Sequence, residues 1–277
     1  MKVVNLDANF TPFGDGESYE ESTFSGGEPH FSCVIDTSED YLITTRLSDS
    51  DRLTKFLVAA DAIKRQNPKS LKAFIPYFPG ARQDRVCNPG EALTAKVYCD
   101  LINQIGLDQV FIFDVHSDVV PALLDNCNAL NNHQLVSSIT RDLKEFVLIS
   151  PDGGALKRVF KLAQYLGGVR VIEASKRRDT KTGKLTSFHV YEEDLSGLNC
   201  LVVDDICDGG GTFLGLAEAL QKKNANELYL FASHGIFAKG FDHLTPHYNK
   251  MYTTNSFRDF KDDRIIQIPL TPKVLDI

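Results

Sequence analysis

The feature that most constrains this chain is the regular alternation of short apolar runs with amphipathic stretches from residue 50 onward. Continuous apolar runs such as Val110–Phe113 and Leu201–Val203 predict strands whose two faces are both covered. Residues 50–65 carry apolar side chains at helical spacing after a Ser-Asp-Ser start signal, which predicts a helix. Strands that alternate with helices favour βαβ units. The sequence therefore predicts an α/β fold with mostly parallel sheets.

The same alternation occurs in both halves of the chain, and a length of 277 residues suits about two domains. The predicted strands are 73–77, 110–113, 147–149, 169–174, 201–203 and 228–232, and the predicted helices are 50–65, 89–105, 155–166 and 212–222. Residues 126–138 are polar and weakly patterned, and residues 1–23 look polar and extended. We expect domains over 1–143 and 144–277, with the extreme C-terminus packing back on the first domain.

Composition excludes several classes of protein. The chain has 30 Lys and Arg against 37 Asp and Glu, a net charge of −7, so it lacks the basic footprint of a nucleic-acid binder. It has no apolar stretch of about 18 residues, so we expect no membrane partner. Asp7 interrupts any signal-peptide run, and the six cysteines form no C-x-x-C pair. Reduced thiols and a cytoplasmic location follow.

The strongest motif lies at residues 202–212. There, acidic residues directly follow a predicted strand, and a run of glycines directly precedes a predicted helix. Backbone amides in a glycine loop and at a helix N-terminus suit a phosphate, and adjacent carboxylates suit the hydroxyls of a sugar. The residues that we assign to sugar-phosphate binding are Asp204, Asp205, Asp208, Gly209, Gly210, Gly211 and Thr212. An ordinary strand–turn–helix junction is the alternative.

This loop resembles that of type I phosphoribosyltransferases and of ribose-phosphate pyrophosphokinases. Other segments resemble the second family only, and they are 75–85 (Ile-Pro-Tyr-Phe-Pro-Gly-Ala-Arg-Gln-Asp-Arg), 114–118, 150–154, 176–178 and 233–237. The resemblance covers about residues 24–257. It implies two similar phosphoribosyltransferase-like domains, each a mostly parallel sheet flanked by helices.

The resemblance also implies an activity. The reaction moves the β,γ-pyrophosphoryl group of ATP to the anomeric hydroxyl of ribose 5-phosphate, with Mg²⁺ as cofactor, and gives phosphoribosyl pyrophosphate and AMP. A phosphoribosyltransferase that consumes this product and a catalytically silent, synthetase-associated regulatory subunit are the alternatives. We expect ATP and a ribose 5-phosphate-type substrate as partners, and a homo-oligomer, a dimer or higher.

By resemblance, the ATP-binding residues are Phe24, Glu28, Arg82, Gln83, Asp84 and His116. The register of the first two is open, because Phe13–Glu17 fits the family's Phe-x-Asp-Gly-Glu pattern more literally. Spacing to Ala81–Arg85 favours Phe24–Glu28, which puts Gly26 where the family usually has Asp.

The resemblance implies that His116 and Asp152 lie at metal-linked positions and that Lys176 and Arg178 form a catalytic pair. Residues 179–184 are polar and turn-prone, as a mobile lid should be. Cations on such a lid would neutralise charge that develops on the β-phosphate.

The phosphate loop departs from the family at one position. The family usually reads Asp-Thr-Gly-Gly-Thr, whereas this chain has Gly209 in place of the first Thr. The change removes a hydroxyl donor and opens space beside the 5-phosphate. It is compatible with a larger acceptor such as ADP-ribose, which would give ADP-ribose pyrophosphate in NAD-related metabolism.

Overall fold

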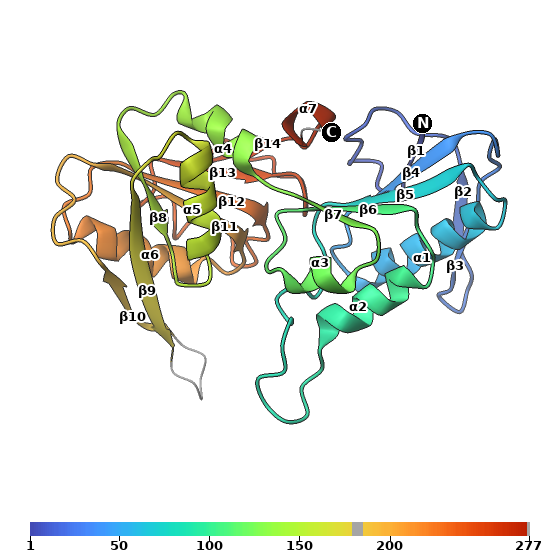
Figure 1. Ribbon diagram of the computed structural model, residues 1–277, viewed down its shortest axis with the longest axis horizontal. Helices are drawn as coiled ribbons and strands as arrows, with labels where there is room; N and C mark the ends of the chain where they lie inside the picture. Colours follow the sequence, from blue (N-terminus) through green and yellow to red (C-terminus); the bar gives the residue numbers. More distant parts are fainter. Residues whose placement is uncertain (179–184, 276–277) are drawn as a thin grey trace. The chain divides into compact units, whose positions relative to one another are not determined.

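The computed structural model describes the backbone of residues 1–178 and 185–275, and their side chains except those of residues 177, 178, 185 and 186. The chain divides into two compact units (Figure 1). The first holds Met1–Asn131, Ser256–Arg258 and the segment from Leu270 onward; the second holds Asn132–Asn255 and Asp259–Pro269. The division thus falls earlier than the 143/144 boundary expected from sequence.

The first unit is built on a five-stranded parallel sheet with strand order β1-β4-β5-β6-β7. Its strands are β1 (Lys2–Asn5), β4 (Asp40–Thr44), β5 (Ser70–Ile75), β6 (Gln109–Phe113) and β7 (Cys127–Leu130). Its helices are α1 (Ser50–Lys64), α2 (Thr94–Asn103), α3 (Val119–Leu123) and α7 (Pro272–Leu275). A separate antiparallel hairpin pairs β2 (Glu20–Thr23) with β3 (Pro29–Ser32).

The helix predicted at 50–65 is confirmed as α1. The Asp49 carboxylate caps it by accepting a hydrogen bond from the backbone N–H of Arg52 at 2.9 Å. Its buried side chains recur every three or four residues, so one face of the helix packs into the core with the sheet. These residues are Leu53, Phe56, Ala59, Ala60 and Ile63.

The second unit is built on a seven-stranded sheet of order β10-β9-β8-β11-β12-β13-β14, in which only β10 is antiparallel to its neighbour among the residues described. Its strands are β8 (Phe146–Ser150), β9 (Val171–Arg178), β10 (Leu185–Val190), β11 (Asn199–Cys207), β12 (Leu228–Gly235), β13 (Lys250–Thr254) and β14 (Ile265–Ile268). Its helices are α4 (His133–Thr140), α5 (Leu156–Tyr165) and α6 (Gly211–Gln221). Every residue of β12 is buried, as the apolar run predicted.

Two segments differ from the sequence interpretation. The weakly patterned segment 126–138 contains β7 and the start of α4. β7 lies at the edge of its sheet and is only half-buried, so it lacks the apolar run of a central strand. The α4 helix belongs to the second unit, where the Asn132 amide donates to the Ser233 hydroxyl at 3.2 Å. The division therefore precedes α4.

The N-terminal segment is also more structured than expected. β1 pairs with β4, and Val4 is fully buried. The ring of Phe10 stacks on Phe74 with centroids 6.1 Å apart, and Phe13 meets Phe74 edge-on at 5.4 Å. The predicted helix at 89–105 begins only at Thr94. Gly90, with φ of 91°, and Leu93, with ψ of 75°, both have non-helical backbone conformations.

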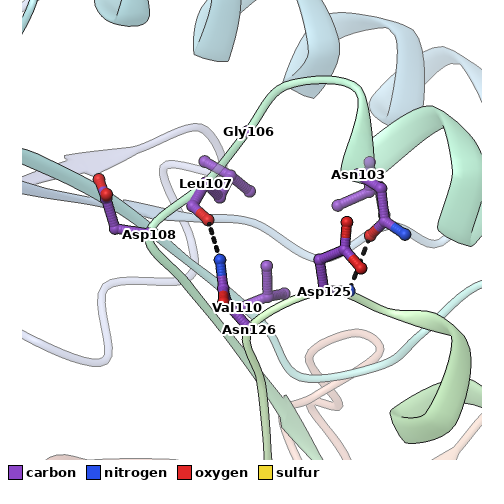
Figure 2. Close-up of a pocket in the computed structure, with 8 residues that line it drawn as sticks. Asn103, Gly106, Leu107, Asp108, Val110, Asp125 and Asn126 are labelled. Atoms are coloured by element: carbon purple, nitrogen blue, oxygen red, sulfur yellow. Dashed lines mark hydrogen bonds between the residues drawn. The ribbon is translucent and has the colours of Figure 1, made fainter.

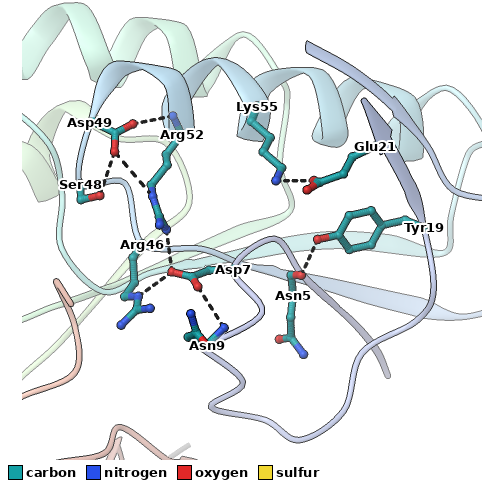
Figure 3. A network of polar contacts seen from close by, with 10 residues as sticks. All are labelled: Asn5, Asp7, Asn9, Tyr19, Glu21, Arg46, Ser48, Asp49, Arg52 and Lys55. Atoms are coloured by element: carbon teal, nitrogen blue, oxygen red, sulfur yellow. Dashed lines mark hydrogen bonds and ion pairs between the residues drawn. The ribbon is translucent and has the colours of Figure 1, made fainter. Parts of the chain in front are cut away.

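A buried ion cluster lies where β1 and β4 end (Figure 3). The Asp7 carboxylate accepts hydrogen bonds from Arg46 Nε at 2.7 Å and from Arg52 Nη1 at 2.6 Å. The side chains of Asp7 and Arg46 are only 5 % and 4 % exposed. Burial opposes ionisation of Asp7, but the bonds from the two guanidinium groups hold its pKa below the ordinary value of 3.8. The cluster therefore contributes stability as a charged unit.

No helix in the described part of the chain combines the length and the apolar character that a membrane crossing requires.

The variant Asp7→Asn should lower the free energy of unfolding by roughly 3 kcal/mol at pH 7, because it leaves Arg46 buried without its carboxylate. The exposed Asp61–Arg65 pair gives the control: Asp61→Asn should cost less than about 0.5 kcal/mol. The pKa of Asp7 is lowered on folding, so its contribution is complete above pH 3.8 and is lost as the pH falls through the folded pKa. Urea unfolding followed by circular dichroism measures both variants; equal losses would contradict this assignment.

Candidate functional site

Several charged residues of the second unit lie together at the carboxyl ends of neighbouring strands of its sheet. β8 lies between β9 and β11 and runs parallel to both, so the carboxyl ends of the three strands are neighbours. Asp152 follows β8, Lys176 lies near the end of β9, and Asp204 and Asp205 lie near the end of β11. Ligand sites of open α/β sheets are found at such edges.

Lys176 and Asp152 are in direct contact. The Lys176 ammonium lies 2.5 Å from Asp152 Oδ2, and the two side chains are 22 % and 24 % exposed. Burial disfavours the Asp152 carboxylate, but the Lys176 bond and charge and the backbone N–H of Ala155 together lower its pKa below 3.8. The structure thus places Lys176, one of the two residues predicted to be catalytic, in contact with Asp152, which is predicted to bind a metal. Both charged groups are partly accessible to solvent.

The adjacent carboxylates of β11 share one guanidinium group. Arg158 Nη2, on α5, donates to Asp204 Oδ1 at 3.0 Å and to Asp205 Oδ1 at 2.8 Å. Burial and the neighbouring charge of Asp205 raise the pKa of Asp204 well above 3.8, while Arg158 acts in the opposite direction. The charge of Asp152 also raises the pKa of Asp204, so these acids form one electrostatic cluster.

Arg158 was not among the residues predicted from sequence. An arginine in an amphipathic helix is usually interpreted as a solvent-facing side chain. Its two acidic partners, Asp204 and Asp205, are also far from it in the sequence. The only available signal was its place just after the segment 150–154, in the first turn of the predicted helix.

The glycine loop after β11 has the geometry of an anion cradle. Gly210 is the N-cap of α6 and adopts a left-handed conformation with φ of 75°. A Cβ at this position would lie 2.5 Å from His243 Nε2, so glycine is required both by the backbone and by the space. Gly211 then begins α6, and the first N–H groups and positive end of a helix favour an anion. Thr212 is half-buried beside them, and Asp208 precedes them.

In the first unit, Arg82, Gln83 and Asp84 lie together on the loop between β5 and α2. Gly80 turns this loop with φ of 70°, and the backbone N–H of Gln83 donates to the Gly80 carbonyl at 2.8 Å. Arg82 and Gln83 are exposed. Asp84 pairs with Arg85, whose Nε lies 3.5 Å away and whose side chain is 77 % exposed. The loop is held rigidly, and it presents polar side chains to solvent.

Phe24 and Glu28 frame the turn of the β2–β3 hairpin. The Phe24 N–H donates to the Glu28 carbonyl at 2.9 Å, and the Phe24 side chain is 60 % exposed. A Cβ at Gly26 would lie 2.5 Å from Glu28 Oε2, so the Glu28 carboxylate occupies the space beside this glycine. The competing motif Phe13–Glu17 packs on the sheet instead, through the Phe13–Phe74 contact and a 3.0 Å ion pair from Lys2 to Glu17. Of the two, the Phe24 register presents its aromatic ring for stacking.

His116 is half-buried on the loop that follows β6, in the first unit, whereas Asp152 belongs to the second. Within residues 1–178 and 185–275, no three His, Cys, Asp or Glu side chains are grouped to hold a metal by themselves. A cation at Asp152 would therefore take most of its ligands from substrate and water. Mg²⁺ is usually coordinated in this way in proteins.

The structure describes only part of Arg178, the other residue predicted to be catalytic. The backbone of Arg178 ends β9, but its side chain and the predicted lid at 179–184 lie outside the described residues.

Two pockets of the first unit contain none of the predicted residues. Figure 2 shows one of about 150 Å³ at the amino ends of β6 and β7, where the Asn126 amide donates to the Leu107 carbonyl at 2.9 Å. Arg82 and His116 follow the carboxyl ends of β5 and β6, so they lie at the opposite ends of the strands from this pocket. The second pocket, of about 260 Å³, lies beside the Asp7 cluster (Figure 3).

The parallel sheets and the glycine loop define an α/β protein of the phosphoribosyltransferase-like class. Family models bear this out. The model described as the phosphoribosyl transferase domain matches residues 122–257, and the model described as the N-terminal domain of ribose phosphate pyrophosphokinase matches residues 10–106.

Individual relatives identify the family. The chain is 30 % identical over 237 residues to the ribose-phosphate pyrophosphokinase of Vibrio cholerae serotype O1, covering 84 % of this chain and 72 % of the relative. It is 33 % identical over 210 residues to that of Rhizobium meliloti, covering 73 % of this chain and 66 % of the relative. The chain belongs to the ribose-phosphate pyrophosphokinase family. It spans about two thirds of the length of several of these curated relatives.

The fold agrees with a solved member of this family. The crystal structure of phosphoribosylpyrophosphate synthetase from Mycobacterium smegmatis matches with a TM-score of 0.83 at 23 % identity, covering 95 % of this chain and 89 % of that one. Two phosphoribosyltransferase-like domains, each with a parallel sheet flanked by helices, are thereby confirmed.

The variant Arg158→Met should lower the free energy of unfolding by roughly 2 kcal/mol at pH 8, because it leaves two adjacent buried carboxylates without their cation. An aspartate whose pKa is raised on folding costs stability above its unfolded pKa, and protonation relieves that cost. The loss should therefore be smaller at pH 5 than at pH 8. Urea unfolding at both pH values measures it, and Arg158→Lys, which keeps the charge, should lose less. A pH-independent loss would contradict the role of Arg158.

Proposed function

We propose that the protein is a pyrophosphokinase that transfers the β,γ-pyrophosphoryl group of ATP to the anomeric hydroxyl of a ribose 5-phosphate-type acceptor. The observation that carries this proposal is the cluster at the edge of the second sheet. There the Lys176–Asp152 pair stands beside the Asp204–Asp205 carboxylates, whose strand leads into the glycine loop. Family membership supports the same chemistry, since the relatives carry this enzyme's name.

The reaction needs no protein nucleophile. The anomeric oxygen of the acceptor attacks the β-phosphorus of ATP, the bond between that phosphorus and the α,β-bridging oxygen breaks, and AMP leaves with the bonding electron pair. The hydroxyl proton is released. Such transfers depend on positioning and on stabilising charge at the phosphates. Lys176 would supply a cation to the transferred group, with Arg178 as a second.

Each part of the acceptor has a proposed binding group. Amides of Gly209, Gly210 and Gly211 and the Thr212 hydroxyl would hold the 5-phosphate at the start of α6, with Asp208 preceding them. Asp204 and Asp205 would accept hydrogen bonds from the ribose hydroxyls. Arg158 orients these two carboxylates by donating to Oδ1 of each.

For ATP, we propose a set of residues that all belong to the first unit. Arg82 offers a planar donor fork to phosphate, with Gln83 and Asp84 on the same loop. The exposed Phe24 ring would stack on the base, and Glu28 lies at the same turn. His116 completes this set.

We propose Mg²⁺ as the cofactor. By family resemblance, Asp152 and His116 are the metal-linked side chains. The Asp152 carboxylate is partly accessible, and oxygen ligands suit this ion. When bound, the ion supplies charge neutralisation on the polyphosphate.

Two acceptors fit the loop. Ribose 5-phosphate is the acceptor implied by the relatives' name. ADP-ribose, whose distal ribose also has a free anomeric hydroxyl, is the larger candidate. It is favoured by one observation: Gly209 carries no side chain, and a Cβ there would lie 3.6 Å from the flexible Lys239 side chain and not against the backbone. Separate assays with each acceptor distinguish them.

A transferase that consumes the product and a silent regulatory subunit are less well supported. A phosphoribosyltransferase would need only the second unit, whereas residues 10–106 match the pyrophosphokinase N-terminal domain. A silent regulatory subunit would not need the Lys176–Asp152 pair.

We further propose a cytoplasmic homo-oligomer, a dimer or higher. All six cysteines are free, which fits a reducing compartment.

The variant Lys176→Ala should lower the rate of AMP release from ATP by about 100-fold or more, because it removes a cation from the transferred phosphate. Lys161→Ala provides the matched control, since Lys161 is exposed on α5 away from the sheet edge. The control should keep the wild-type rate, and both variants should keep the wild-type circular dichroism spectrum. Unchanged AMP release in Lys176→Ala would remove the proposed role.

Chelation tests the metal. AMP formation should fall to background when EDTA is added and return when Mg²⁺ is supplied in excess, because the polyphosphate charge would otherwise be unscreened. Undiminished turnover in EDTA would contradict the cofactor assignment.

A further inference from the structure

Gly209 is not required by its own backbone. Its φ is outside the left-handed region, in contrast to Gly210 at 75°. A Cβ at Gly209 would lie 3.6 Å from Lys239 Cδ and Cε and 3.8 Å from Lys239 Cγ, which is ordinary contact distance. Neither conformation nor crowding therefore explains glycine here. The missing side chain at position 209 leaves a space, and the aliphatic part of the Lys239 side chain lies next to this space.

Lys239 is held at this place by the backbone. It follows β12 on a loop whose Ile236 N–H donates to the Cys207 carbonyl at 2.9 Å and whose Ala238 N–H donates to the Asp208 carbonyl at 3.0 Å. These bonds fasten the Lys239 loop to the loop that carries Gly209. The position of the lysine is thus set by main-chain contacts that a side-chain substitution leaves intact.

The Lys239 ammonium has no hydrogen bond or ion pair among residues 1–178 and 185–275. The chain carries a net charge of −7 and pairs many of its surface lysines with acids, for example Lys96 with Asp100 at 2.6 Å. An unpaired cation next to an anion-binding loop is therefore available to a ligand.

A second side chain of the same region points to a ligand. His243 Nε2 is buried and has no hydrogen-bond partner in the described part of the chain. It faces Gly210, since a Cβ there would lie 2.5 Å from it. A ring nitrogen can donate to a phosphate oxygen, and a buried polar atom is seldom left without a partner.

We propose that Lys239 is an acceptor-binding residue that contacts the 5-phosphoryl group of the ribose substrate, in place of a side chain at position 209. This inference rests on the proposed function. A lysine is a mobile point charge with three donors, so it can follow a phosphoryl group outward from the glycine loop. The ligand chemistry is a ribose 5-phosphoryl group, whether it ends as a monoester or continues as a diphosphate ester.

The test compares Lys239→Met with the matched control Lys250→Met. Lys250 is also exposed, but it lies at the amino end of β13, the opposite edge of the sheet from the glycine loop. Binding of ribose 5-phosphate and of ADP-ribose is measured by calorimetry without ATP, and KM is measured for each acceptor and for ATP. Lys239→Met should weaken the preferred acceptor roughly tenfold or more, as loss of a charged hydrogen bond does, with the KM for ATP unchanged.

Two further variants separate charge from packing. Lys239→Arg should retain most of the acceptor affinity. The double variant Gly209→Thr with Lys239→Gly restores a hydroxyl to the loop and should regain affinity for ribose 5-phosphate relative to Lys239→Gly alone. A larger loss for ADP-ribose than for ribose 5-phosphate would identify the diphosphate ester as the ligand, and the reverse would identify the monoester.

Failure of this inference can be told from failure of the proposed function. If the wild-type protein releases AMP and Lys239→Met binds and turns over both acceptors like Lys250→Met, the inference is overturned and the function stands. If the wild-type protein releases no AMP with either acceptor, the function fails. The calorimetric comparison still decides Lys239, because equal affinity, or no affinity in any variant, would overturn its role.

Discussion

The candidate site depends on one electrostatic constraint, the crowding of carboxylates where parallel strands end side by side. β8 and β11 are neighbours, so Asp152, Asp204 and Asp205 lie in one cluster. Such a cluster is tolerable only with cations among its members. Arg158 bridges the two acids of β11, and Lys176 pairs with Asp152. The groups that stabilise this end of the sheet are the ones that we propose to bind a phosphorylated, hydroxyl-rich substrate.

This arrangement makes a net charge of −7 compatible with the proposed binding of anions. The acids of the site are paired with Arg158 and Lys176. The proposed phosphate-binding groups are the glycine loop, the start of α6 and Lys239, which has no ion pair within the described part of the chain. Overall charge excludes a broad basic surface, but a site is governed by the few groups within a Debye length of the ligand. The acidic composition and the anionic substrates are therefore compatible.

The strand pattern predicted where the residues of the 204–212 loop lie, because this loop follows a buried apolar run. Asp152 and Lys176 were assigned by family resemblance, and the structure places them at the carboxyl end of the same sheet; the functional roles of all these residues stay predictions. Arg158 and Lys239 were not predicted, because a helix arginine and a loop lysine look like solvent-facing residues until their spatial neighbours are known. The edge strand β7 was missed because a half-buried edge needs no apolar run. β1 was missed because its short apolar run is flanked by polar residues.

We propose that ATP is cleaved between its α- and β-phosphates and that the pyrophosphoryl group moves intact to an anomeric oxygen. Phosphorus NMR of the complete reaction, with ATP, Mg²⁺ and each acceptor in turn, tests this directly. We expect AMP and a new diphosphate ester on the anomeric carbon, formed in equal amounts. Formation of ADP with a monophosphorylated acceptor, or of free pyrophosphate with no sugar product, would contradict it.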